Sequence, residues 1–222
     1  MGTSVIAVRV GAEPRHTDFT VNEKLICESS DFFKAALARE WRESQERLVK
    51  LPSCHQKYFH IYVQWLYSGH LHVSDSGDVK TAVAKANLMQ SYLLADFLQD
   101  SRYKDFLMDT IREWVKGSTV RECESLVQDY AEEMFRETAT ESSIRRLLVD
   151  AAVWRLGHSF WKANKVKLPA EFTQEAVSGF SDRCQFGSSA SDPFVPDKRG
   201  YDVFLYHFHG KKKCHGAGQE ES

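Results

Sequence analysis

Residues 59–69 have the sequence FHIYVQWLYSG, the most distinctive stretch of this 222-residue chain. Its large apolar side chains recur at helical intervals, at Phe59, Tyr62, Trp65 and Leu66. This spacing predicts a helix over residues 55–68, and Gly69 supplies its stop, because glycine readily adopts the left-handed conformation that closes a helix. Just upstream, residues 47–51 alternate between polar and apolar as far as Pro52, a pattern that predicts a short strand.

A second group of signals lies further upstream, over residues 5–40. Residues 5–11 are a β-branched run closed by glycine, and residues 18–21 follow a turn at residues 13–16, which predicts a hairpin of two short strands. Asn22 can cap a helix that begins beside it, since its side chain can accept a free backbone N–H. Ser30 can cap a second helix over residues 31–40, with an apolar face at Phe33, Ala36 and Leu37.

The pattern after Gly69 is mostly helical. Leu71 and Val73 can form a brief edge strand. A buried helix is predicted from residue 79 onward by apolar positions three or four residues apart, namely Val79, Ala82, Val83, Ala86, Met89, Leu93 and Phe97. Further helices are predicted over residues 106–117, 126–134 and 144–154. Residues 181–200, rich in Ser, Asp, Gly and Pro, are typical of a linker, and residues 201–209 can form a final strand.

This order of elements and its particular residues resemble the BTB/POZ domain, in the variety common in filamentous fungi. The resemblance rests on residues 19–37, with their serine and phenylalanine pair, and on residues 41–44, 49–52 and 59–69. It implies an α+β fold in which a small mixed sheet of short strands is flanked by a helical cluster, followed here by a C-terminal all-helical extension. Read in this way, the chain has four parts. These are a BTB/POZ domain at 1–117, with most motifs in 5–75, a helical extension at 118–180, a flexible linker at 181–200, and a short strand with a disordered polar tail at 201–222.

Two features depart from the family pattern. Asn22 stands where the family usually has a histidine. The chain also begins almost at its first predicted strand, so we expect no room for the upstream segment that many metazoan members exchange between the subunits of a dimer.

The composition excludes several classes of protein. Hydrophobic residues make up 42% and charged residues 27%, close to globular averages. The net charge is −2, so the chain lacks the basic excess typical of proteins that bind nucleic acid or anionic membranes. No apolar run approaches the roughly 20 residues that span a bilayer. Five cysteines with irregular gaps and no signal peptide favour reduced thiols in the cytoplasm or nucleus.

Motifs for catalysis and cofactor binding are not found in the sequence. It has no Gly-x-Ser-x-Gly elbow, no His-Glu-x-x-His and no glycine-rich phosphate loop, so we expect neither an enzyme nor a cofactor. Cys54 and His55 are adjacent, and their side chains should diverge rather than form a nucleophile–base pair. Capping and solvent exposure explain the regularly spaced acids Asp96, Asp100, Asp105 and Asp109.

The sequence does not predict a metal site at the C-terminus, although potential ligands are present there. The potential zinc ligands are Cys184, His207, His209, Cys214 and His215. They lack the paired Cys-x2-Cys spacing that is typical of structural zinc, so a docked edge strand or a solvated tail is favoured. The basic run at residues 211–213 is too short for a nucleic-acid patch.

The resemblance implies a protein–protein interaction module that self-associates through its first strand and first helices. It also implies docking to a cullin scaffold of a ubiquitin ligase through residues 70–78. There Val73 is the candidate apolar anchor and Asp75 the candidate acidic contact, although capping of the loop explains Asp75 equally well. The alternative is a transcriptional or chromatin co-regulator that recruits its partners through the same domain. No Kelch, zinc-finger or ankyrin period, which would supply a second recognition domain, follows residue 117.

Overall fold

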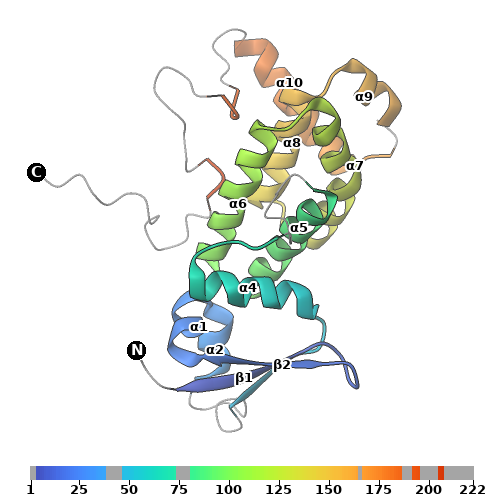
Figure 1. The fold of residues 1–222 in the computed structure, drawn as a ribbon. Coiled ribbons are helices and arrows are strands. Elements are labelled where there is room, and N and C mark those ends of the chain that lie inside the picture. Colours follow the sequence, from blue (N-terminus) through green and yellow to red (C-terminus); the bar gives the residue numbers. More distant parts are fainter. Residues whose placement is uncertain are drawn as a thin grey trace, which may run out of the picture. The chain divides into compact units, whose positions relative to one another are not determined.

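The computed structural model describes residues 4–38, 47–73, 81–164, 167–186, 192–195 and 205–207 (Figure 1). It consists of two compact units, Met1–Leu107 and Met108–Ser222. Strands are found only in the described part of the first unit, and the described regular elements of the second unit are all helical. This arrangement confirms the predicted α+β fold with helices following the mixed unit.

The sheet has three short strands in the order β2-β1-β3. The central strand β1 (Val5–Val10) pairs antiparallel with β2 (Thr17–Asn22) and parallel with β3 (Leu48–Leu51). Val8 lies opposite Phe19 of β2 and Val49 of β3. Since side chains alternate between the two faces of a strand, this register places the buried residues Ile6, Val8, Val10, Val21, Val49 and Leu51 on one face.

Two short helices follow the hairpin, and each begins at the cap that the sequence predicted. Asn22 accepts a hydrogen bond from the backbone N–H of Leu25 at the start of α1 (Glu23–Ser29). Ser30 accepts one from the backbone N–H of Phe33 at the start of α2 (Asp31–Ala36). The second helix is shorter than predicted, because Leu37 ends it, and residues 39 and 40 lie outside the described residues.

Helix α4 (Gln56–Ser68) matches the predicted aromatic helix and ends at Gly69, whose φ of 71° is left-handed. Its buried aromatic residues pack in series, with Tyr62 next to Phe59 on one side and Trp65 on the other. Trp65 in turn contacts Tyr103 of α6 (Ser101–Lys116), with ring centroids 4.5 Å apart. These rings form the centre of the first unit.

Helix α5 (Ala82–Phe97) shows where the sequence reading was wrong. The predicted apolar face included Val83 and Phe97, yet both are exposed. The buried face includes polar residues as well, namely Lys85, Asn87 and Ser91. The buried residues therefore cover a wider part of the helix than the predicted apolar positions and lie mostly on a different side. The predicted edge strand at Leu71 and Val73 is also wrong, because residues 71–73 are described and form no strand.

The second unit is built from α7 (Val120–Glu137), α8 (Ser143–Arg155), α9 (His158–Asn164) and α10 (Ala170–Phe186). Helix α8 packs against both α7 and α10. Helix α10 continues through residues 181–186, where the sequence predicted the start of a linker, because Phe180 packs on Trp161 and Arg183 lies over the ring of Trp154. Of the predicted strand over residues 201–209, only residues 205–207 are described, and they form a turn.

Candidate functional site

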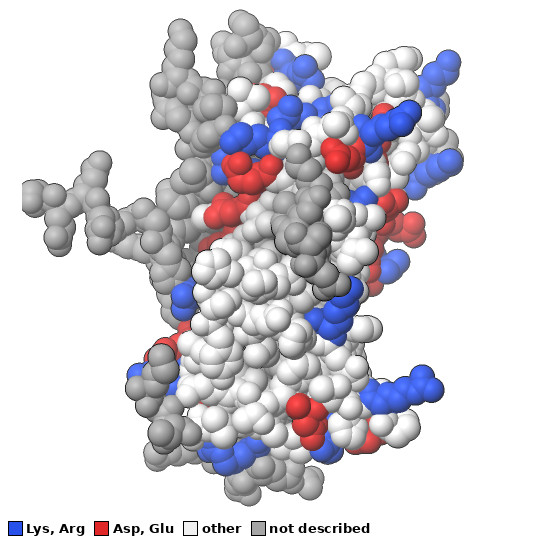
Figure 2. Space-filling view, in the orientation of Figure 1, with Lys and Arg blue, Asp and Glu red and all other residues white. Residues whose placement is uncertain are grey.

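On the face drawn in Figure 2, charged side chains of both signs lie in the upper and lower parts, and the area between them is largely uncharged. Few of them lie over α4, whose only charged residue is Lys57. Among the described residues, no helix combines the length and the apolar character needed to cross a bilayer. Neither a cluster of like charges on this face nor a membrane-spanning helix among the described residues therefore marks a site.

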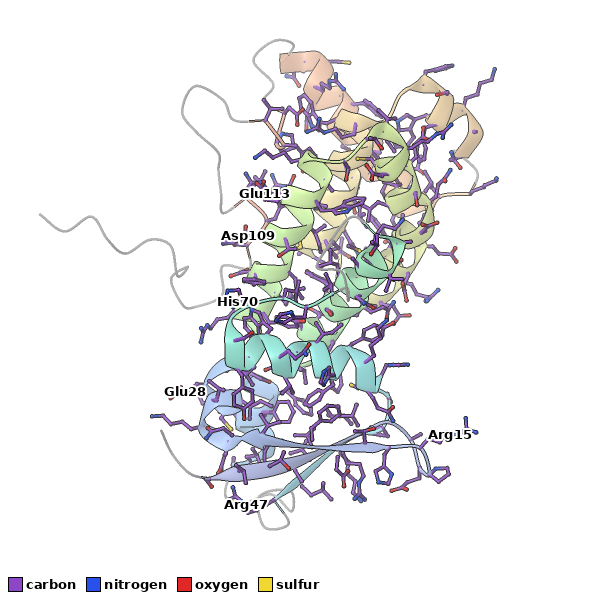
Figure 3. The ribbon with its side chains drawn as sticks, viewed as in Figure 1. Arg15, Glu28, Arg47, His70, Asp109 and Glu113 are labelled. Carbon is purple, nitrogen blue, oxygen red and sulfur yellow. The ribbon has the colours of Figure 1, made fainter. Side chains whose placement is uncertain are left out.

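The two site residues predicted from the sequence belong to the segment that leaves α4 at Gly69 and His70 (Figure 3). Val73 is only 3% exposed, and its carbonyl accepts a hydrogen bond from Asn87 Nδ2 of α5 at 2.7 Å. Asp75 lies outside the described residues. The side chain of Val73 thus packs within its own chain, whereas the anchor of an interface must reach its partner.

A partly exposed aromatic pair lies where α2 meets the end of α5. The rings of Phe32 and Phe97 have centroids 5.2 Å apart, and Phe97 is 49% exposed. Phe32 also makes an edge contact with the fully buried Phe33. The ring contacts therefore run from the core through Phe32 to the surface at Phe97. One turn further along α2, Ala35 is exposed. We call Phe32, Ala35 and Phe97 the α2–α5 patch.

The backbone beneath the α2–α5 patch is fixed by hydrogen bonds between the two helices. Ser30 Oγ donates to the carbonyl oxygen of Leu98 at 2.5 Å, and the N–H of Phe32 donates to the same oxygen at 3.3 Å. The N–H of Asp31 donates to the carbonyl oxygen of Gln99 at 3.4 Å. The backbone that carries these rings is therefore fixed before another surface packs on them, and such preorganisation favours binding.

A buried carboxylate connects this region to the core. Asp100 Oδ2 accepts hydrogen bonds from Ser29 Oγ at 2.5 Å and Tyr62 Oη at 2.9 Å, and Oδ1 accepts one from the N–H of Tyr103 at 2.9 Å. Burial raises the pKa of Asp100, although these donors act in the opposite direction. Both carboxylate oxygens are engaged within the unit, so Asp100 joins α1, α4 and α6 and has a structural role.

The sequence reading missed the α2–α5 patch because it placed Phe97 on the buried face of α5. Periodicity alone treats every apolar residue on one stripe as core. Phe97 is in the last turn of its helix, next to the partly exposed Asp96, and this position is the one available signal that the ring could be exposed. Phe32 was recognised only as half of a phenylalanine pair.

The candidate nucleophile and its neighbour do not form a catalytic pair. Burial raises the pKa of the Cys54 thiol to about 11, which keeps it protonated and unreactive near neutral pH. The Nδ1 atom of His55 accepts a hydrogen bond from the N–H of Lys57 and caps α4. Both residues therefore have roles in the local fold.

The candidate metal ligands are not brought together in the described part of the chain. Cys184 is exposed on α10, and His207 Nε2 lies 3.0 Å from Asp109 Oδ1. His209, Cys214 and His215 lie outside the described residues. Among the residues that are described, no three histidine, cysteine or acidic side chains are placed to hold a metal ion.

Comparison with models of known protein families identifies a match in the first part of the chain. The family model of the BTB/POZ domain matches residues 6–111. The match includes β1 from its second residue, all of β2, β3, α1, α2, α4 and α5, and most of α6. A search of curated proteins finds no match.

Proposed function

Because residues 6–111 of this chain are a BTB/POZ domain, a protein–protein interaction module, we propose that the protein is a non-enzymatic module that self-associates through the α2–α5 patch. The observation that carries the proposal is the pair of Phe32 and Phe97, whose rings are in contact and partly exposed. Aromatic side chains are enriched at protein interfaces because they contribute large contact areas with few rotatable bonds. The proposed surface belongs to the first helices, where the family resemblance implies self-association.

The first test is the mass of the protein in solution. We expect light scattering to give about twice the chain mass of 25.5 kDa for the wild type, and about one chain mass for Phe97→Asp. A charge in the middle of an apolar contact loses its hydration without gaining a partner, which disfavours association. The matched control is Val177→Asp on α10, because Val177 is also an exposed apolar residue and lies outside the patch. A monomeric wild type, or a Phe97→Asp variant that stays dimeric, would contradict the proposal.

Docking to a cullin scaffold remains a prediction for this chain. Val73 would have to leave its packed position to act as an anchor, and Asp75 lies outside the described residues. Affinity purification from native extract tests the prediction directly. If a cullin co-purifies with the wild type and with Phe97→Asp, the docking surface is separate from the α2–α5 patch. Recovery of transcriptional or chromatin proteins in place of a cullin would favour the co-regulator alternative.

A further inference from the structure

Two short segments after α10 pack against helices of the second unit. Phe194 is buried, and Tyr206 is only 2% exposed. The two rings lie nearly parallel, with centroids 6.5 Å apart. Arg155 of α8 lies over the ring of Phe194, with its guanidinium carbon 5.3 Å from the ring centroid. Phe194 and Tyr206 are thus distant from α8 in the sequence but form an aromatic pair that packs on this helix.

Polar side chains of the helices complete this contact. Tyr206 Oη donates a hydrogen bond of 2.7 Å to Asp150 Oδ2 of α8, and Arg146 lies over the Tyr206 ring at 5.9 Å. The next residue, His207, places Nε2 3.0 Å from Asp109 Oδ1 of α6. Asp109 and Glu113 occupy the same side of α6 (Figure 3), so this side of the helix is acidic. We call Asp109, Arg146, Asp150 and Arg155 the aromatic receptor.

In the aromatic receptor, the buried carboxylate of Asp150 is stabilised by the hydroxyl of the Tyr206 side chain that occupies it. Burial, together with the nearby carboxylate of Asp192, raises the pKa of Asp150, and the Tyr206 hydroxyl and Arg146 act in the opposite direction. Loss of Tyr206 would remove the hydroxyl donor from a buried carboxylate, which is costly unless another donor replaces it. The side chains that meet these acids are thus a ring that carries a hydroxyl and, one residue later, an imidazole.

These contacts are made by side chains: two rings, one hydroxyl and one imidazole. A few aromatic anchors seated on a helix surface, with one buried polar contact for register, are typical of peptide recognition. We propose that the aromatic receptor is a peptide-binding site, and that Phe194, Tyr206 and His207 are its built-in ligand, exchangeable for a peptide of the same chemistry. The partner class is a segment with a tyrosine followed by a histidine and with a further aromatic residue upstream.

The test uses the full chain and a fluorescent synthetic peptide that copies residues 190–210. In the Phe194→Ala/Tyr206→Ala variant the receptor loses its own ligand, so we expect the added peptide to bind. Wild type should bind at least tenfold more weakly, because its tethered segment competes at an effective concentration of about 1 mM. A peptide carrying Tyr206→Phe should bind the variant about tenfold more weakly than the natural peptide, since it lacks the hydrogen bond to Asp150.

The matched control is full-length Val195→Ala, because Val195 is exposed and adjoins Phe194. It should bind the added peptide as weakly as wild type does. The proposal is overturned if the double variant melts as cooperatively as wild type but does not bind the peptide, or if it binds the Tyr206→Phe peptide equally well. A double variant that no longer melts cooperatively would also overturn it, because the two rings would then belong to the permanent core.

Discussion

Among single residues, Asp100 joins several elements through hydrogen bonds, and its contribution to the free energy of unfolding depends on pH. Its carboxylate receives three hydrogen bonds, from Ser29, Tyr62 and Tyr103. Burial nevertheless raises its pKa above the ordinary value of 3.8. The folded protein therefore holds the Asp100 proton more tightly than the unfolded chain does. Stability contributed by this proton is complete below pH 3.8 and is lost as the pH rises through the folded pKa.

The first prediction concerns Asp100→Asn, which removes the titrating proton but keeps the shape of the side chain. As the pH rises from about 4 to 7, we expect the free energy of unfolding of wild type to fall relative to that of the variant. Urea denaturation at a series of pH values measures this difference. A difference that stays constant across the range would show that the pKa of Asp100 is the same in the folded and unfolded chain.

A second residue-scale prediction concerns the glycine that ends α4. Gly69 has a φ of 71°, and a Cβ built there meets no atom within 4 Å, so substitution would cause backbone strain without a clash. We expect Gly69→Ala to lower the free energy of unfolding by about 1 kcal/mol. Gly157→Ala is the matched control, because its Cβ also meets open space and its φ lies outside the left-handed range. It should change stability by less than about 0.5 kcal/mol, and equal losses in both variants would refute the strain argument.

At the scale of elements, helix starts were predicted better than helix faces. The caps Asn22 and Ser30 act locally, through hydrogen bonds to residues three positions ahead, so the sequence alone contains both partners. The buried face of α5 depends instead on distant partners. Asn87, for example, is buried, and its side chain donates a hydrogen bond to the carbonyl of Val73, a residue outside its own helix. A periodic apolar pattern carries no information about such a contact, and this is why Phe97 was misplaced.

Arg145 of α8 joins helices of the second unit through hydrogen bonds, so its loss should destabilise the fold. Its side chain is 6% exposed and donates hydrogen bonds to the carbonyl oxygens of Phe135 and Thr138 and to Glu171 of α10. We expect Arg145→Ala to lower the free energy of unfolding by about 3 kcal/mol, because buried carbonyls would lose their donors. Arg136→Ala, which removes an exposed pair with Glu137, should cost less than about 1 kcal/mol. Chemical denaturation compares the two variants, and equal costs would contradict a joining role for Arg145.

At the scale of the whole molecule, the chain combines an identified interaction domain with a second, helical unit. The net charge of −2 gives no strong overall field to steer a partner. An apolar contact surface, as proposed at the α2–α5 patch, is compatible with this balance. The predicted boundary at residue 117 coincides with the end of α6, and it stays a prediction.

Because the proposed contact is apolar, we expect self-association to depend little on salt. If the apolar α2–α5 patch holds two copies together, the dimer dissociation constant should change less than about threefold between roughly 0.05 M and 0.5 M NaCl, because salt screens charges but not apolar burial. Sedimentation or light scattering over a dilution series measures it. A steep loss of dimer with salt would instead indicate ion pairs across the interface.

Local patterns in the sequence were enough to predict the family resemblance, the three strands of the sheet and most of the helices. Caps, the alternation of strand residues and the helical spacing of residues 59–69 are local patterns, and each is set by residues within a few positions of one another. Which side chains are exposed followed instead from the tertiary fold. It buried Val73 against α5, exposed Phe97 beside Phe32, and seated Tyr206 on Asp150 across 56 positions of sequence. Exposure depends on which distant residues share a contact, and sequence spacing does not specify such contacts.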